Sequence, residues 1–341
     1  MSVRVAVNGF GRIGRTVTRI ALDRPGVDIV AVNDLERPEL LAHLFTYDST
    51  HGRLAEKVVV DDGDLVVAGR RISVVQERDP AALPWRELGV DLVVESTGVF
   101  TDATAAAAHL KAGASRVVIA APATNEDATV VLGVNEHVLH ERHQVVSNAS
   151  CTTNCAALLA KTLHDAFGVR RGLMNTAHAY TSDQRLQDLP HRDYRRARAA
   201  AVNIIPTTTG AAKAIGKVLP ALAGRIDGLS MRVPVVDGSV VDLTVEVATQ
   251  VTVSDVNLAF QKAASGDLAD LLVYTEDPLV SADIVGTAAS CTFDAALTMV
   301  SDVDDAGSLV KVVGWYDNET GFSHRTLDLV ELLGRHVTAA R

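Results

Sequence analysis

The sequence has few cysteines and no long apolar run. Its three cysteines, Cys151, Cys155 and Cys291, are too few and too unevenly spread for a disulfide framework, so we expect a reducing compartment. No apolar run approaches the about 18 residues that a membrane-spanning helix needs. Strand-like sequence begins directly after Met1, without the charged and apolar leader of a secreted protein. We therefore expect a cytoplasmic protein with no membrane partner.

Basic residues are also fewer than acidic ones. The 32 lysines and arginines face 42 aspartates and glutamates, which gives a formal net charge of -10. Such a chain has no overall attraction to nucleic acid, so we expect no nucleic-acid partner, and an anionic substrate would require local arginines. The 11 histidines and three cysteines include no second ligand pair at zinc-site spacing, so we expect no metal.

The first part of the chain alternates valine-rich runs with helix-like stretches. The runs that predict buried parallel strands are Val3–Val7, Ile29–Val32, Asp91–Val94 and Val117–Ala120. Candidate helices between them include Arg12–Asp23 and Ala103–Ala112. This alternation predicts an α/β fold with a doubly wound parallel-sheet (Rossmann) nucleotide domain over 1–150.

After Cys151 the pattern changes to helices, an arginine-rich polar loop and alternating strands such as Val240–Val247. We expect an α+β catalytic domain with a mainly antiparallel sheet over 151–317. The last helix, from about Thr326, is expected to rejoin the first domain as part of 318–341. We find no internal repeat and no Pro/Gly/Ser linker, so the two halves are expected to pack together.

A glycine-rich turn follows the first predicted strand. Gly9-Phe10-Gly11-Arg12-Ile13-Gly14 has G-x-G-x-x-G spacing at the start of a predicted helix, where backbone amides can hold a pyrophosphate. Asp34 follows at the end of the next strand, where a carboxylate can accept hydrogen bonds from an adenosine ribose. The alternative is a turn that only connects a strand to a helix.

Cys151 precedes a run of good helix formers and should lie at or near a helix N-terminus, where unpaired amides favour a thiolate. A helix end alone is too weak to activate the thiol, and an imidazolium from His178 could supply the rest. The alternatives are a small buried cysteine and a structural histidine. Cys155, one turn later, is expected to serve packing.

Five segments together resemble one known family. They are NGFGRIGR from Asn8, SNASCTTNC around Cys151, HAYTSDQ from His178, RRARAAAVNIIPTTTGAAKAIGKVLP from Arg195 and WYDNETGFS from Trp315. The resemblance, which runs from end to end, is to phosphorylating, NAD-dependent glyceraldehyde-3-phosphate dehydrogenase.

The resemblance implies a reaction. Cys151 would attack the aldehyde of D-glyceraldehyde 3-phosphate, His178 would act as its base, and hydride would pass to the cofactor NAD. Inorganic phosphate would then release the thioester as 1,3-bisphosphoglycerate, a step of glycolysis and gluconeogenesis. The family also implies a homotetramer, in which the loop from Thr181 to Asn203 reaches a neighbour's cofactor.

The same resemblance assigns the binding residues. Substrate phosphate would be held by Thr181 and Arg232, and the attacking phosphate by Ser150, Thr152, Arg196, Thr209 and Gly210. The cofactor-binding set would be Asn8, Gly9, Gly11, Arg12, Ile13, Asp34, Arg78, Thr97, Asp183 and Asn318. A solvated face or an ion-pair network between subunits is the alternative for the arginines near Arg196.

Three features depart from the usual family pattern. Ala120 stands near the expected nicotinamide where relatives often carry Ser or Thr, Phe322 replaces the usual Tyr, and Ala156-Ala157-Leu158 replaces a proline-containing stretch. These changes bear on inhibitor sensitivity and remove no group that the chemistry needs.

Two other functions stay open at this point. An erythrose-4-phosphate dehydrogenase would share the cysteine and the histidine but hydrolyse its thioester, although such enzymes tend to lose the Thr207–Gly210 stretch kept here. A catalytically silent nucleotide-binding interaction protein could use the same fold.

Overall fold

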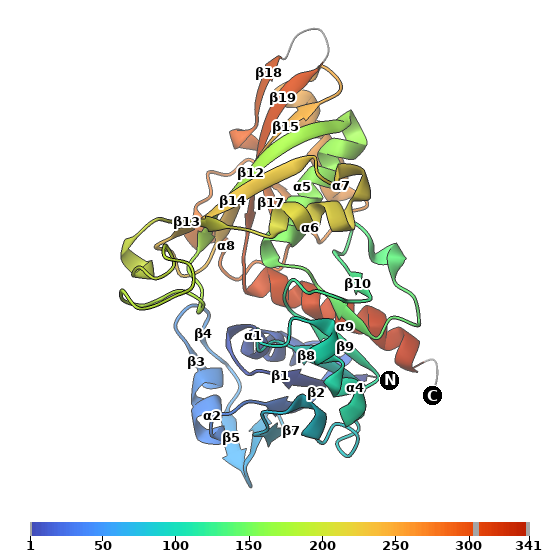
Figure 1. Ribbon diagram of the computed structural model, residues 1–341, viewed down its shortest axis with the longest axis vertical. Helices are drawn as coiled ribbons and strands as arrows, with labels where there is room; N and C mark the ends of the chain where they lie inside the picture. The colour runs from blue at the N-terminus through green and yellow to red at the C-terminus, as the bar shows by residue number, and fades with distance from the viewer. Residues whose placement is uncertain (1, 303–306, 339–341) are drawn as a thin grey trace. The chain divides into compact units, whose positions relative to one another are not determined.

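The computed structural model describes residues 2–302 and 307–338, which form two compact units (Figure 1). The first unit comprises Met1–Val130, His137–Ala149 and Ser323–Arg341, and the second comprises Val131–Glu136 and Ser150–Phe322. We keep the predicted limits, 1–150 with 318–341 and 151–317, as a proposal for the folding domains.

A largely parallel sheet forms the centre of the first unit. Its strands run in the order β10-β11-β9-β8-β1-β2-β7-β6-β5, and only β7-β6-β5 are joined in antiparallel fashion. The bounds are β1 Val3–Asn8, β2 Val27–Asn33, β5 Val58–Asp61, β6 Asp64–Val67, β7 Arg70–Val75, β8 Leu92–Glu95, β9 Arg116–Ile119, β10 Ala128–Thr129 and β11 Val145–Ser147, with a hairpin of β3 Tyr47–Asp48 and β4 Gly52–Arg53. Read from β7 to β11, the parallel core has the 3-2-1-4-5-6 order of a doubly wound nucleotide fold, which confirms the predicted class.

The helices of this unit are shorter or differently bounded than the sequence predicts. They are α1 Arg12–Ala21, α2 Pro38–Thr46, α3 Ala103–Ala106, α4 Ala108–Ala112 and most of α9 Thr320–Thr338. The single helix expected over Ala103–Ala112 is interrupted at Ala107, whose ψ of -9° opens the turn. The last helix begins at Thr320 and not at Thr326, because the Asp317 carboxylate accepts hydrogen bonds from the Glu319 and Thr320 amides and starts the helix there.

The second unit is built on a mainly antiparallel sheet, as predicted. Its order is β13-β14-β12-β15-β19-β17-β16, β18 pairs with β19, and only β12–β14 and β16–β17 are parallel. The bounds are β12 Val169–Ala179, β13 Ile205–Thr208, β14 Ile226–Val233, β15 Ser239–Val247, β16 Leu272–Thr275, β17 Cys291–Asp294, β18 Met299–Asp302 and β19 Ser308–Tyr316. Along β15 every second residue is buried, as expected for a strand with one face on the core.

The second unit also contains helices. They are α5 Cys151–Phe167, α6 Ala211–Val218, α7 Val253–Ser265 and the short α8 Ser281–Ile284. The long helix α5 packs on β15 and β19 and against α6 and α7 (Figure 1). Because residues 152–160 of α5 are all buried, the N-terminal half of the helix is anchored in the core. In the part of the chain that the structure covers, none of the helices combines the length and the apolar character needed to cross a bilayer.

Candidate active site

Cys151 is the first residue of α5, as the sequence predicts. Ser150 caps the helix, since its side chain accepts a hydrogen bond from the Thr153 amide at 3.0 Å. Cys155 is fully buried and its thiol donates to the Gly314 carbonyl at 3.6 Å, in agreement with the packing role expected for it. Cys151, by contrast, is partly accessible as a residue, although its environment desolvates the sulfur.

His178 lies beside this thiol at the end of β12. Its Nε2 atom is 3.4 Å from Cys151 Sγ, and its Nδ1 atom is 2.6 Å from the Ala179 carbonyl oxygen. Two groups compete for Nδ1: the Ala179 carbonyl at 2.6 Å requires a proton on it, whereas Arg232 Nη1, at 3.1 Å, could donate to it only if it carried a lone pair. We assign the proton to Nδ1 because the carbonyl contact is shorter, and the lone pair of Nε2 then faces the thiol. His178 is therefore set to take the proton of Cys151 when the sulfur attacks.

Burial keeps this pair neutral. It raises the pKa of Cys151 to about 11, although the Arg232 charge opposes that shift. Burial also lowers the pKa of His178 to about 3, and Arg232 adds to the effect. The sequence predicted an imidazolium beside a thiolate, but this geometry favours a neutral histidine and a neutral thiol. Desolvation opposes the charge on both groups, and the cation near them is Arg232.

Arg232 approaches His178 from the neighbouring strand β14, directly opposite it in the parallel register of β12 and β14. Its Nη1 atom donates to Thr181 Oγ1 at 2.9 Å and to the Ala179 carbonyl at 3.2 Å. Its buried Nε atom finds no hydrogen-bond partner in the described structure. A guanidinium with an open donor beside the catalytic pair is suited to bind an anionic oxygen.

Arg196 is held by a separate set of contacts in the same unit. It forms an ion pair with Asp183, and its Nε atom donates to Thr207 Oγ1 at 2.9 Å. The Thr207 hydroxyl in turn donates to Asp193 at 2.9 Å. Burial would raise the pKa of Asp183, but the hydrogen bond from Thr181 and the charges of Arg232 and Arg196 lower it, so this carboxylate stays ionised.

The remaining residues expected to bind phosphate have varied surroundings. The Thr152 hydroxyl is buried and lies 2.8 Å from the Tyr316 hydroxyl, which also contacts Thr176 at 2.9 Å. Thr209 and the exposed Gly210 precede α6, and Thr209 Oγ1 accepts a hydrogen bond from the Ala211 amide at 3.1 Å. The side chain of Thr152 is therefore already engaged within the core.

The glycine-rich turn in the first unit has the backbone that a dinucleotide requires. Gly9 has a φ of 90°, and a Cβ atom there would lie 2.7 Å from the Thr97 nitrogen. A Cβ atom on Gly14 would lie 2.1 Å from the Gly9 carbonyl oxygen, so the helix can pack this close only without a side chain. A Cβ atom on Gly11 would meet nothing within 4 Å, which leaves open space before the N-terminus of α1.

The other predicted cofactor residues of the first unit come from the turn itself, the first turn of α1 and the segments after β2 and β7. Asp34 accepts hydrogen bonds from the Phe10 amide at 2.8 Å and the Glu36 amide at 3.2 Å, so it braces the turn. Arg12 pairs with Asp48 at 2.6 Å, Ile13 is half-buried in the first turn of α1, and Arg78 is exposed after β7. Asp183 and Asn318 belong to the second unit, where Asn318 Oδ1 accepts from Ser239 Oγ at 2.5 Å.

The chain matches known proteins over nearly its whole length. The family model described as "Glyceraldehyde 3-phosphate dehydrogenase, NAD binding domain" matches residues 3–103, and the one described as "Glyceraldehyde 3-phosphate dehydrogenase, C-terminal domain" matches residues 150–318. The chain belongs to the glyceraldehyde-3-phosphate dehydrogenase family.

Individual relatives agree with this assignment. The chain is 58% identical to glyceraldehyde-3-phosphate dehydrogenase 1 of Streptomyces avermitilis over 98% of this chain and 99% of that protein. It is 58% identical to the Geobacillus stearothermophilus enzyme over 96% and 97% of the two chains, and 55% identical to enzyme 1 of Bacillus subtilis over 98% and 99%. Like the family, it is an NAD-dependent oxidoreductase.

The sequence did not point to several groups that support the site of this glyceraldehyde-3-phosphate dehydrogenase family member. Tyr316 orients Thr152 and packs its ring edge-on against His178, with 5.9 Å between ring centroids. Thr207 links Arg196 to Asp193, and Ser239 holds Asn318. Apart from the family segments that contain some of them, no spacing rule connects residues so far apart in the chain.

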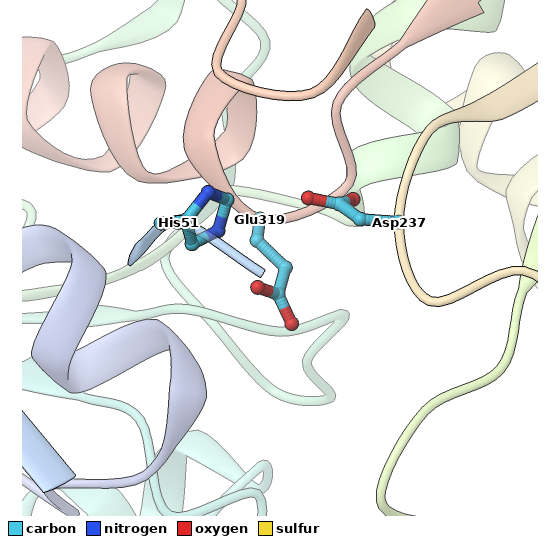
Figure 2. A group of neighbouring side chains, drawn as sticks. All are labelled: His51, Asp237 and Glu319. Carbon is cyan, nitrogen blue, oxygen red and sulfur yellow. The ribbon is translucent and has the colours of Figure 1, made fainter. Parts of the chain in front are cut away.

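Asp237 is an acidic group buried beside Asp317. Figure 2 shows its carboxyl group pointing toward the segment that carries Glu319. Burial first, and then the charges of Asp317 and Glu319, raise its pKa to about 8. Its Oδ1 atom accepts from the Gly238 amide at 2.9 Å. His51, also labelled in Figure 2, belongs to the first unit.

This shift predicts a pH dependence of stability. The carboxyl of Asp237 has a higher pKa in the folded chain than the value of about 3.9 expected on unfolding, so the folded state loses stability as pH rises from about 4 through about 8. We expect Asp237→Asn to flatten this slope. At pH 8 it should raise the Tm by a few degrees, which corresponds to about 1 kcal/mol in the free energy of unfolding. Thermal melts between pH 5 and pH 9 measure the effect.

The chain offers a matched control at Asp227, which makes the same bond to the following Gly228 amide, at 2.8 Å, but is exposed. Asp227→Asn should leave the slope unchanged. Equal slopes for wild type and Asp237→Asn would contradict the assigned shift.

Proposed function

We propose that the protein oxidises D-glyceraldehyde 3-phosphate with NAD and inorganic phosphate, through a hemithioacetal and a thioester on Cys151, to 1,3-bisphosphoglycerate. The observation that carries the proposal is the 3.4 Å approach of His178 Nε2 to Cys151 Sγ, with Arg232 in the adjacent strand. The membership of the family supports the same reaction. The activity would serve glycolysis and gluconeogenesis in the cytoplasm.

The first step forms a carbon–sulfur bond. Cys151 Sγ attacks the aldehyde carbon while the thiol proton moves to His178 Nε2, and Nε2 then passes that proton to the aldehyde oxygen, which gives the hemithioacetal hydroxyl and a neutral His178. The Cys151 amide and the protonated His178 Nε2 are the donors for the oxygen as charge develops on it, at about 10²-fold in rate or more for each donor.

The second step removes hydrogen from the hemithioacetal. His178 Nε2 accepts the hydroxyl proton, the carbon loses its hydride and becomes a thioester, and NAD when bound supplies the hydride acceptor. Among the residues of the chain, Asn318 is proposed to hold the carboxamide of the cofactor, since Ser239 fixes its Oδ1 atom and leaves the amide NH2 group for a ligand.

The third step releases the acyl group. An oxygen of inorganic phosphate attacks the thioester carbon, the carbon–sulfur bond breaks, and Cys151 regains its proton from His178. Ser150, Thr152, Arg196, Thr209 and Gly210 are proposed to bind this phosphate, and Thr181 and Arg232 the phosphate of the substrate. Asp183 would contact the cofactor ribose.

The decisive test is NADH formation from glyceraldehyde 3-phosphate with and without inorganic phosphate, followed by trapping of the acyl phosphate with hydroxylamine. We expect sustained turnover only with phosphate. Sustained turnover without phosphate would indicate hydrolysis, as in an erythrose-4-phosphate dehydrogenase. NAD binding without any turnover would indicate the silent interaction protein.

We also propose a homotetramer. The loop between β12 and β13 exposes large apolar side chains, with 83% of Leu186 and 89% of Tyr194 accessible in the single chain. Such a patch on one loop suits contact with another subunit. Light scattering on the purified protein gives the assembly mass, and a monomer would contradict the proposal.

The two arginines should differ in their kinetic effects. Arg232→Leu is expected to lower kcat/KM for glyceraldehyde 3-phosphate by about 10²-fold or more, but to change use of unphosphorylated glyceraldehyde by less than about tenfold, because only the former needs the charge. Arg196→Leu should instead raise the KM for inorganic phosphate by about tenfold. Steady-state kinetics with both aldehydes and varied phosphate distinguishes the two.

Arg198, an exposed neighbour that pairs with Asp188 at 2.8 Å, supplies the control. Arg198→Leu should leave kcat/KM for both aldehydes and the KM for inorganic phosphate close to the wild-type values. Equal losses with both aldehydes in Arg232→Leu and Arg196→Leu would mean that the arginines only support the structure.

A further inference from the structure

A chain of buried polar side chains crosses the first unit beneath the carboxyl ends of β8, β1 and β2. Trp85 and His109 are 0% exposed, Asn8 and Glu95 are 2% exposed, and Asn33 is 6% exposed. None of these side chains except Asn8 has a role in the reaction described above. A buried ionisable pair that costs free energy to desolvate invites a functional explanation.

Each donor in this chain has an acceptor. The Trp85 indole donates to His109 Nδ1 at 3.0 Å, His109 Nε2 lies 3.1 Å from Glu95 Oε2, and Asn8 Nδ2 donates to the same oxygen at 2.5 Å. An indole N–H can only donate, so Nδ1 must hold a lone pair and the ring proton must lie on Nε2, pointing at Glu95. Trp85 therefore fixes both the tautomer and the orientation of His109.

The other oxygen of Glu95 holds the strand end itself. Glu95 Oε1 accepts from the Thr97 amide at 2.8 Å and also from the Thr97 hydroxyl. The backbone of Thr97 in turn lies against Gly9, where no side chain would fit. The Glu95 carboxylate thus fixes the end of β8. It also fixes Asn8, the residue that directly precedes the glycine-rich turn.

The chain continues across the sheet toward the adenosine side. Asn33 Nδ2 donates to Asn8 Oδ1 at 2.7 Å, and Asn33 Oδ1 accepts from the Glu77 amide at 2.9 Å. Glu77 immediately precedes Arg78. The polar chain therefore connects three separate segments that carry residues assigned to the cofactor: Asn8, Thr97 and Arg78.

We propose that Glu95, oriented by His109 and Trp85, is a positioning residue for NAD, which fixes Thr97 and Asn8 at the strand ends that receive the cofactor. The proposal rests on the assignment of Asn8 and Thr97 to the cofactor site. Glu95 suits this role because a carboxylate accepts at both oxygens, whereas all groups that face it, from β1, α4 and the β8 end, are donors.

The test is Glu95→Gln in the full-length protein, with NAD affinity measured by calorimetry in the absence of aldehyde. Glutamine keeps the shape but turns an NH2 group toward donors, either toward Thr97 or toward Asn8 and His109. We expect the Kd for NAD to rise about tenfold and the KM for NAD with it. The rate of Cys151 alkylation without NAD should not change, because Cys151 lies in the other unit.

A second substitution tests the role of His109. Trp85→Phe removes the N–H that locks the tautomer, so His109 could carry its proton on Nδ1 and accept from the new amide at position 95. The double variant Trp85→Phe/Glu95→Gln should therefore bind NAD at least about threefold more tightly than Glu95→Gln alone. Trp85→Phe alone should weaken NAD binding about threefold, which keeps the proposal testable if Glu95→Gln does not fold.

Asp127 supplies the matched control, since its carboxylate also accepts two backbone amides, those of Gln144 and Val145, but on the β10-β11 side of the sheet. Asp127→Asn should lower the Tm without changing the Kd for NAD. An unchanged Kd in Glu95→Gln or in Trp85→Phe, or no recovery in the double variant, would overturn the proposal. Because the Kd for NAD and the rate of Cys151 alkylation are measured without turnover, a protein that bound NAD but failed to oxidise the aldehyde would refute the proposed function alone.

Discussion

Cys151→Ser is expected to abolish aldehyde oxidation, with kcat reduced by about 10⁴-fold or more, while the Kd for NAD stays within about twofold of wild type. A serine hydroxyl beside neutral His178 is a far weaker nucleophile than a thiol, and its ester would not replace the thioester that phosphate must attack. The glycine-rich turn lies in the other unit and keeps its geometry. Stopped-flow NADH formation and calorimetry with NAD measure the two properties separately.

Cys155→Ser is the matched control one helical turn away. Its side chain donates to the Gly314 carbonyl, and a serine hydroxyl can make the same bond, so most activity should remain. An inactive Cys155→Ser together with an active Cys151→Ser would show that the nucleophile is wrongly assigned.

His178→Asn is expected to lower kcat by about 10²- to 10⁴-fold, the range typical of a lost general base. The asparagine can preserve a contact to the Ala179 carbonyl, but it has no lone pair basic enough to take the thiol proton. Alkylation of Cys151 by iodoacetamide near neutral pH should slow for the same reason. The measurements are kcat and the pH profile of alkylation.

A control for this variant is His164→Asn, which removes another histidine of the same unit at the far end of α5, where it accepts from the Val169 amide at 3.1 Å. It should lower stability and leave the alkylation profile unchanged. An alkylation profile in His178→Asn equal to that of wild type would refute the coupling of the two groups.

Local signals predicted much of this site. The helix-forming run after Cys151 was enough to place the thiol at a helix start, and the strand before Gly9 with the helix after Gly11 was enough to predict the nucleotide turn. These predictions succeed because each depends on neighbours within a few residues.

Contacts between distant segments could not be predicted in this way. Nothing in the spacing joins Trp85, His109 and Glu95, because their meeting depends on the order of strands in the sheet and on the depth of burial. Burial also decides the neutral state of Cys151 and His178, which the helix-terminus argument alone would have placed as charged. The sequence thus predicts the reacting groups, and the desolvation around them determines the charge that the structure favours for each.

The parallel pairing of β12 and β14 has a consequence for how this protein can change during evolution. Side chains alternate along each strand, so a single-residue insertion within β12 or β14 would turn either His178 or Arg232 to the opposite face. The connection between α6 and β14, over 219–225, lies outside this strand register and is accessible apart from the buried Leu222, so it could gain or lose residues while the two side chains stay opposite each other. We therefore expect length variation among homologues to occur in that connection and to be absent from the two strands.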